Sequence, residues 1–208
     1  MKWYDIFSSF YDLAIEPVYK KARKQGVEAL WLKEGDLVLD LACGTGPNFK
    51  HIMPVIGESG LLIGVDYSKG MLDKARKKVK KNNWKNVVLI EQDAGKLTTS
   101  EIQEDCGKPI AVDNIICVLG LSVIPEWEAV LQNMFELLAP GGSFIIIDVY
   151  ADKRVFQTWM VERIARADVS RKSWEPLEVL SKDFELSYVS KKRWLHGGLL
   201  FLAHGKKG

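Results

Sequence analysis

The segment that most constrains the fold runs over residues 37–56. An apolar run at 37–41 precedes a small turn, Gly44-Thr45-Gly46, and a helix-like stretch begins at Asn48. A continuous apolar run predicts a buried strand of a parallel sheet. A strand, a glycine turn and a helix in succession present backbone N–H groups to a ligand beyond the end of the strand. The segment therefore predicts an α/β fold with a ligand site at one edge of its sheet.

Apolar runs and helix-like segments alternate along the rest of the chain. This alternation favours a parallel sheet with helices on both faces, and the last two strands form a hairpin-like pair. The expected strands are 37–42, 61–66, 87–91, 114–119, 143–149, 184–190 and 199–204, and the expected helices are 48–56, 68–81, 100–105, 126–138 and 152–167.

The first 35 residues are rich in aromatic and basic side chains. Phe7, Phe10 and Tyr11 recur at helical spacing, and Pro17 can open a second helix that continues to Trp31. We expect a helical cap that precedes the sheet. The chain then reads as one domain, 1–208, made of a cap (1–35), a ligand-binding core (36–150) and a C-terminal helix with closing strands (151–208).

Composition excludes several classes of protein. The net charge is +2 with mixed signs, which gives no electrostatic case for nucleic acid. The apolar runs are too short to span a bilayer, and the first residues do not resemble a secretory signal. Cys43, Cys106 and Cys117 cannot all pair, which predicts a reducing compartment, the cytoplasm. The histidines are isolated, so no metal site is predicted.

The glycine turn does not have the pattern of a nucleotide-binding loop. G-x-G-x-x-G requires a third glycine, but Phe49 stands there, and its ring would keep the next helix away from the strand. No G-x-x-x-x-G-K-[ST] loop occurs, and a nicotinamide enzyme's Tyr-x-x-x-Lys pair is also absent. Asp40, Ala42, Gly44 and Gly46 instead form acid-x-Ala-x-Gly-x-Gly, which resembles motif I of the class I methyltransferases that use S-adenosylmethionine (SAM).

Three further segments strengthen this resemblance. Asp66 follows Gly46 by 20 residues, the interval of an acid that binds a ribose, although an acid there can also cap the next helix. Asp93-Ala94 resembles motif III of the family, 113–119 resembles motif IV, and 137–144 is similar to its L-x-PGG turn. The resemblance covers residues 36–150, with the motifs in the family's order.

The resemblance implies a Rossmann-like, seven-stranded, mostly parallel sheet whose last strand is antiparallel. It implies SAM as the methyl donor, with Asp40 near its amino group, Gly44 and Gly46 along its methionine portion, and Asp66 on the ribose. It places Asp93 and Ala94 at the adenine, between Tyr67 and Met71. The full set of expected cofactor-binding residues is Asp40, Ala42, Gly44, Gly46, Asn48, Asp66, Tyr67, Met71, Asp93, Ala94, Cys117 and Val118.

Two groups of methyltransferases, within the type 11 and type 25 kinds, resemble this chain most. Residues 7–13 are similar to the start of ubiquinone and menaquinone C-methyltransferases, but Ser122-Val123 stands where those enzymes carry Arg-Asn. The turn 44–49 and the Trp-rich tail are similar to phosphatidylethanolamine N-methyltransferase-like enzymes. We expect a small-molecule or lipid head-group acceptor. A quinone-ring C-methyltransferase remains as one alternative. A non-catalytic SAM-binding subunit is the other, because no general base is evident.

The acceptor side is predicted from aromatic and loop residues. Tyr4, Phe10 and Tyr11 are candidates if the N-terminal helix closes over SAM instead of packing on the sheet. His196, between the last two strands, is a further candidate, although a surface loop histidine is the simpler interpretation. The basic run 74–81 is either a solvated helix face or a contact with anionic lipid, which leaves peripheral membrane contact open.

Overall fold

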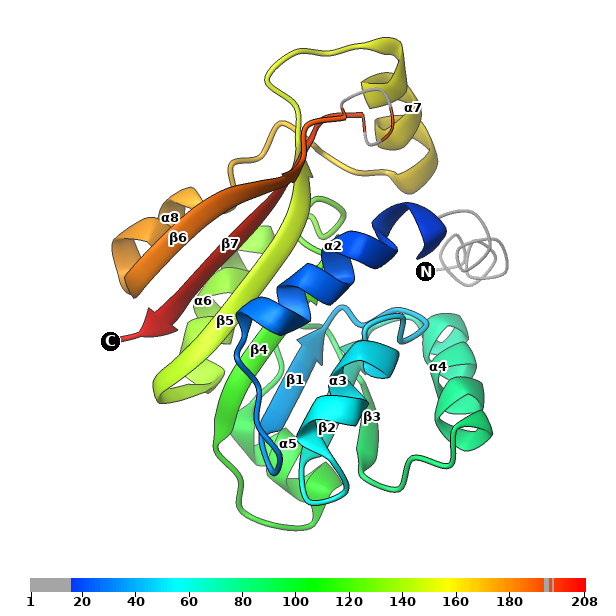
Figure 1. Ribbon diagram of the computed structural model, residues 1–208, viewed down its shortest axis with the longest axis vertical. Helices are drawn as coiled ribbons and strands as arrows, with labels where there is room; N and C mark the ends of the chain where they lie inside the picture. The colour runs from blue at the N-terminus through cyan, green and yellow to red at the C-terminus, as the bar shows by residue number, and fades with distance from the viewer. Residues whose placement is uncertain (1–15, 193–194, 196) are drawn as a thin grey trace.

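The computed structural model describes residues 16–192, 195 and 197–208, and these form a seven-stranded sheet in the order β3-β2-β1-β4-β5-β7-β6 (Figure 1). Neighbouring strands from β3 to β5 are parallel, and β7 is antiparallel to both β5 and β6. The strands are β1 (Leu37–Leu41), β2 (Leu61–Asp66), β3 (Val87–Glu91), β4 (Val112–Val118), β5 (Leu138–Tyr150), β6 (Ser181–Ser190) and β7 (Leu199–Lys207).

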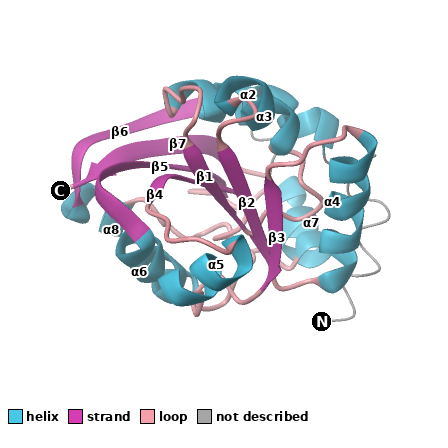
Figure 2. Cartoon of the chain, turned by 90° about the horizontal axis from the view of Figure 1, so that it is seen from below, coloured by secondary structure: helices cyan, strands magenta, loops and turns pink. Residues whose placement is uncertain are grey.

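Helices cover both faces of this sheet (Figure 2). One face packs against α2 (Glu16–Ala29), α3 (Phe49–Ile56) and α4 (Lys69–Lys81), and the other against α5 (Thr99–Cys106), α6 (Trp127–Leu137) and α8 (Glu175–Leu180). The helix α7 (Phe156–Ala165) follows β5 at the end of the sheet. Two apolar cores result, one on each face, because the fully buried central strands present apolar side chains in both directions.

The predicted fold class is confirmed, and the differences concern element boundaries and one additional helix. β5 begins at Leu138 rather than 143, because Leu138 already pairs with Val112 across a register shift. α7 is shorter than the expected helix 152–167 and ends where Arg166 takes a left-handed φ of 54°. α8 was not expected, although a proline at its first turn is a helix-start signal.

The second helix of the predicted cap is confirmed as α2. It packs across β5, and its buried side chains join the core on that face, as Ala22 and Val27 do. Trp31 lies beyond the end of the helix, is exposed and takes a left-handed φ of 52°. The first predicted helix, around Phe7 and Phe10, lies outside the described residues.

Phe49 does not hold α3 away from the sheet, which corrects the expectation from its sequence. Its ring is fully buried, and a Cβ at Gly46 would lie 2.5 Å from it. A Cβ at Gly64, in the middle of β2, would lie 2.9 Å from the same ring. The two positions without a side chain therefore make the space in which the aromatic ring packs between α3 and the sheet.

Replacing Phe49 by alanine will leave a cavity between α3 and β2. We expect Phe49→Ala to lower the free energy of unfolding by about 3–5 kcal/mol, measured by urea denaturation. Val55→Ala, in the same helix but at an exposed position, is the matched control and should cost well under half as much. Equal losses in the two variants would contradict the packing role of Phe49.

Candidate functional site

A cavity of about 400 Å³ lies at the carboxyl edge of the sheet, where the loops after β1, β2, β3 and β4 meet. This is the position at which open α/β sheets bind ligands, because the strand order reverses beside β1. The lining residues are Ala42, Gly44, Asp66, Tyr67, Met71, Glu91, Gln92, Asp93, Ala94, Val118, Leu119, Gly120, Val123, Ile124, Pro125 and Glu126.

The carboxylate of Asp66 joins the ends of β1 and β2. One of its oxygens, Oδ2, accepts the N–H of Gly44 at 2.8 Å, and Oδ1 accepts the N–H of Ser68 at 2.9 Å. Gly44 takes a left-handed φ of 57°, and a Cβ there would meet no atom within 4 Å, so its backbone borders open space. Ser68 caps α4 as its position predicts, and its side chain accepts the N–H of Met71.

The residues after β3 form the second wall. Asp93 accepts the N–H of Gly95 at 2.9 Å, which shapes the loop, while Ala94 is buried against the cavity. The lining also includes Met71 of α4, which is buried, and Tyr67, which is exposed. This part of the lining therefore combines apolar side chains with a carboxylate and backbone groups that can take part in hydrogen bonds.

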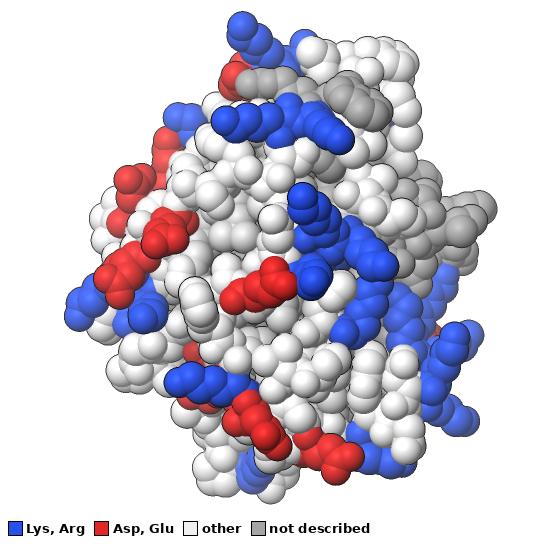
Figure 3. Space-filling model, in the orientation of Figure 1, with Lys and Arg blue, Asp and Glu red and all other residues white. Residues whose placement is uncertain are grey.

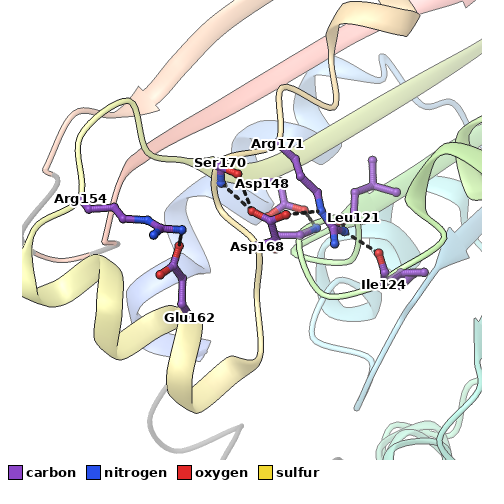
Figure 4. A network of polar contacts seen from close by, with 9 residues as sticks. Leu121, Ile124, Asp148, Arg154, Glu162, Asp168, Ser170 and Arg171 are labelled. Atoms are coloured by element: carbon purple, nitrogen blue, oxygen red, sulfur yellow. Dashed lines mark hydrogen bonds and ion pairs between the residues drawn. The ribbon is translucent and has the colours of Figure 1, made fainter.

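The loop after β4 forms the third wall, and a polar network from the C-terminal third of the chain supports it (Figure 4). Nη1 of Arg171 donates to the carbonyls of Leu121 at 2.8 Å and Ile124 at 2.5 Å. Its Nε donates to Asp168 at 3.1 Å. The buried carboxylate of Asp148, on β5, accepts the N–H of Ser122 at 2.9 Å. These bonds hold the loop in one conformation beside the cavity.

A buried polar chain stands behind the glycine turn. The side-chain amide of Asn48 donates to both carboxylate oxygens of Asp40, at 3.0 and 3.1 Å, and Arg23 of α2 donates to Asn48 at 2.9 Å. Burial raises the pKa of Asp40 from 3.8 to about 7, although the bond from Asn48 and the charge of Arg23 oppose the rise. The chain ties α2 to the turn after β1.

Of the expected cofactor-binding residues, most line the cavity, and Asp40, Gly46, Asn48 and Cys117 do not. Asp40 and Asn48 lie behind the turn, Gly46 makes room for Phe49, and Cys117 is a buried core residue whose thiol pKa is raised by burial. Tyr4, Phe10, Tyr11 and His196 lie outside the described residues. Residues that line the cavity without having been expected are Glu91, Gln92, Leu119, Gly120 and Val123, together with 124–126.

The lining residues that were not predicted lie at or shortly after the ends of predicted strands. Glu91 and Gln92 directly precede Asp93, and Gly120 and Pro125 are turn residues soon after a predicted strand. Since parallel strands end at one edge, loops that follow them are expected to share a site. Which side chains of a loop face the cavity depends on backbone geometry, such as the left-handed φ of 61° at Leu119.

Charge distinguishes this cavity from a phosphate site. The charged residues of its lining, Asp66, Glu91, Asp93 and Glu126, are all acidic. Such a lining favours a cationic ligand and opposes a phosphate-bearing one. Among the described residues, no three His, Cys, Asp or Glu side chains gather as metal ligands would.

The family comparison agrees with this geometry. A family model described as "Methyltransferase domain" matches residues 32–192. The chain belongs to this methyltransferase family. It is a class I, SAM-dependent methyltransferase, and SAM is its methyl donor.

Among curated relatives, the chain is similar to the demethylmenaquinone methyltransferase of Oceanobacillus iheyensis, with 25% identity over 189 residues, 86% of this chain and 76% of that protein. A demethylmenaquinone methyltransferase of Listeria welshimeri is 31% identical over 131 residues, 63% of this chain, but the match spans only about half, 52%, of its length.

Solved structures with lower identity show the same fold. A SAM-dependent methyltransferase from Aquifex aeolicus has a TM-score of 0.64 at 20% identity, over 97% of this chain and 98% of that chain. Haemonchus contortus phosphoethanolamine N-methyltransferase 2, solved with phosphomonomethylethanolamine and S-adenosylhomocysteine, has a TM-score of 0.75 at 12% identity, over 98% of this chain and 57% of that one. Within the described part of this methyltransferase, no helix meets the length and hydropathy needed to cross a bilayer.

The raised pKa of Asp40 predicts a pH-dependent stability. A carboxyl with a pKa near 7 in the folded state and 3.8 as its ordinary value stabilises the fold fully below about pH 4, and this contribution is lost as pH rises to about 7. Asp40→Asn cannot ionise. We expect its free energy of unfolding, relative to the parent protein, to increase between pH 5 and 7 and to level off above pH 7, measured by urea denaturation at each pH. If the difference in free energy of unfolding between Asp40→Asn and the parent does not change with pH, the raised pKa of Asp40 is contradicted.

Proposed function

We propose that SAM binds in the cavity at the carboxyl edge of the sheet. The all-acidic charge of the lining carries this proposal, because SAM is cationic at its sulfonium and its ammonium group and bears no phosphate. The volume of about 400 Å³ is within the range of small-molecule sites.

The proposal assigns a part of SAM to each wall. Asp66 accepts hydrogen bonds from the ribose hydroxyls, Asp93 accepts one from the adenine amino group, and Tyr67 and Met71 flank the ring. Gly44 borders the methionine portion. Asp40 and Asn48 support the turn from behind, because both are buried and neither lines the cavity. We further propose that the chain is one methyltransferase domain that acts in the cytoplasm, in accord with its three free cysteines.

SAM supplies an electrophilic methyl group, which an acceptor lone pair or carbanion takes in an in-line displacement that releases S-adenosylhomocysteine. The residues of this chain bind SAM and the acceptor and orient them relative to each other. The loop after β4 presents Val123, Ile124 and Pro125, an apolar wall that excludes water from the reacting atoms. The hydrogen bonds from Arg171 stabilise the loop after β4. A stable loop favours a near-attack arrangement of the acceptor and the methyl group.

We propose that the acceptor is a small apolar aromatic molecule of the quinol class, methylated at a ring carbon, whose ring proton is released to solvent after the methyl group is transferred. The apolar wall after β4 supports this choice, as does the similarity to demethylmenaquinone methyltransferases. A phosphorylated amine such as phosphoethanolamine is the less favoured acceptor, because no Lys or Arg lines the described cavity. An acceptor other than a quinol is the second candidate, since Ser122 and Val123 stand where the quinone enzymes carry an Arg-Asn pair.

Asp66 provides the direct test of the binding site. We expect Asp66→Asn to weaken SAM binding by about 10- to 100-fold in calorimetric titration, because a charge-assisted bond to a hydroxyl contributes about 1.5–3 kcal/mol. Asp73→Asn, an exposed position on α4, is the matched control and should bind SAM as the parent does. An unchanged dissociation constant for Asp66→Asn in a folded protein would contradict the site.

The acceptor class is tested by turnover. Purified protein is incubated with SAM and either a reduced naphthoquinone without its ring methyl group or phosphoethanolamine, and S-adenosylhomocysteine and product are detected by mass spectrometry. We expect methylation of the naphthoquinol and none of phosphoethanolamine. Methylation of the amine alone would reverse the acceptor assignment. Normal SAM binding with no turnover of either compound would contradict the quinol assignment and indicate an acceptor of another class.

A further inference from the structure

The helix α7 attaches to the sheet through small side chains and exposes its large apolar side chains. Thr158 is fully buried, and its hydroxyl donates to the carbonyl of Gly197 at 2.6 Å. Val161 and Ala165, on the same side of the helix, pack against the core. At 100° per residue, positions 158, 161 and 165 share one face, so this face attaches α7 to the sheet.

The opposite face of α7 carries large apolar side chains. Phe156 is 68% exposed, Trp159 57% and Ile164 46%, and Met160 stands between them. The rings of Phe156 and Trp159 stack with centroids 5.9 Å apart, so they form one continuous surface. Because the outward face of a helix on a globular protein is normally polar, this arrangement marks an interaction surface.

Basic side chains come from the same segment as this apolar face and from just after the end of β6. Residues 151–166 and 191–192 contain six exposed cations, Lys153, Arg154, Arg163, Arg166, Lys191 and Lys192, and two carboxylates, Asp152 and Glu162. Glu162 is already bonded to Arg154 at 3.3 Å. Figure 3 shows Lys and Arg side chains next to neutral surface at the end of the molecule where Figure 1 draws α7. We call this set, the apolar face of α7 with its six cations, the α7 surface.

We propose that the α7 surface binds an anionic lipid bilayer. An aromatic and aliphatic face that enters the boundary between head groups and acyl chains, with Lys and Arg at head-group depth, is the arrangement by which short helices lie on membranes. Long basic side chains also reach the phosphates while their stems cover apolar surface. The cations of both segments, 151–166 and 191–192, favour an anionic surface over a purely apolar partner.

The α7 surface lies at the same edge of the sheet as the cavity, which relates the lipid contact to the acceptor. α7 follows the carboxyl end of β5, and β5 is parallel to β4, so α7 lies at the same edge of the sheet as the cavity. Docking would therefore bring that edge toward the bilayer, where a lipophilic quinol acceptor resides. This last step rests on the proposed function, whereas the lipid contact itself does not.

The test measures binding of the full chain to vesicles of phosphatidylglycerol and phosphatidylcholine in equal parts, by co-sedimentation. We expect the parent protein to bind these vesicles, to bind pure phosphatidylcholine much less, and to be released by high salt. The double variant Phe156→Ser, Trp159→Ser and the double variant Lys191→Gln, Lys192→Gln should each bind about tenfold or more weakly, because one removes the inserted face and the other two charges.

The matched control is Val179→Ser, Leu180→Ser, which removes two apolar side chains that are 84% and 55% exposed on α8. It should bind vesicles as the parent does. All variants should keep the parent's affinity for S-adenosylhomocysteine, since none of these residues lines the cavity. If the parent protein does not bind S-adenosylhomocysteine, the proposed function is contradicted. The vesicle measurement still tests the lipid contact in that case.

Three results would overturn the inference. The first is no binding of the parent to anionic vesicles. The second is equal loss in the α8 control. The third is a dimer, seen by sedimentation equilibrium, that Phe156→Ser, Trp159→Ser dissociates, since a second copy would then be the occupant of the α7 surface.

Discussion

The site depends on two hydrogen bonds that the carboxylate of Asp66 accepts. Its two oxygens accept the N–H groups of Gly44 and Ser68, and so hold together the turn after β1 and the start of α4. Both elements border the cavity, and β1 and β2 are paired in register up to this point. A single buried acid thus joins two segments that both border the cavity. The proposed bond to the ribose uses the same carboxylate.

The two carboxylates on either side of the glycine turn have different surroundings. Asp66 lies at the cavity with two backbone donors, whereas Asp40 lies behind it, with a pKa raised to about 7 despite the bonds from Asn48. Arg23 extends that chain to α2. A helix that precedes the sheet in sequence is therefore tied to the ligand turn by polar contacts inside an apolar core, where unpartnered groups would be costly.

Segments that come late in the chain complete the cavity from outside. Asp148 and Arg171 hold the loop after β4, and neither belongs to a motif of the cofactor-binding core. α7 arises from the same C-terminal region and exposes its large apolar side chains. The cofactor wall and the surface that we assign to lipid thus depend on one part of the chain. This is consistent with an enzyme whose acceptor enters from the side of α7.

Hydrophobic runs and turn residues were enough to predict the α/β class, the five parallel strands and the convergence of Asp66, Asp93 and the glycine turn, because these are local signals and parallel strands end at one edge. The sequence by itself did not determine that Phe49 fits over Gly64, that Asp40 lies behind the cavity, or that Arg171 supports the loop after β4. Each of these depends on side chains far apart in sequence meeting in three dimensions. The direction of the α7 face was likewise decided only by tertiary packing, because helical periodicity identifies two faces but does not say which one is buried.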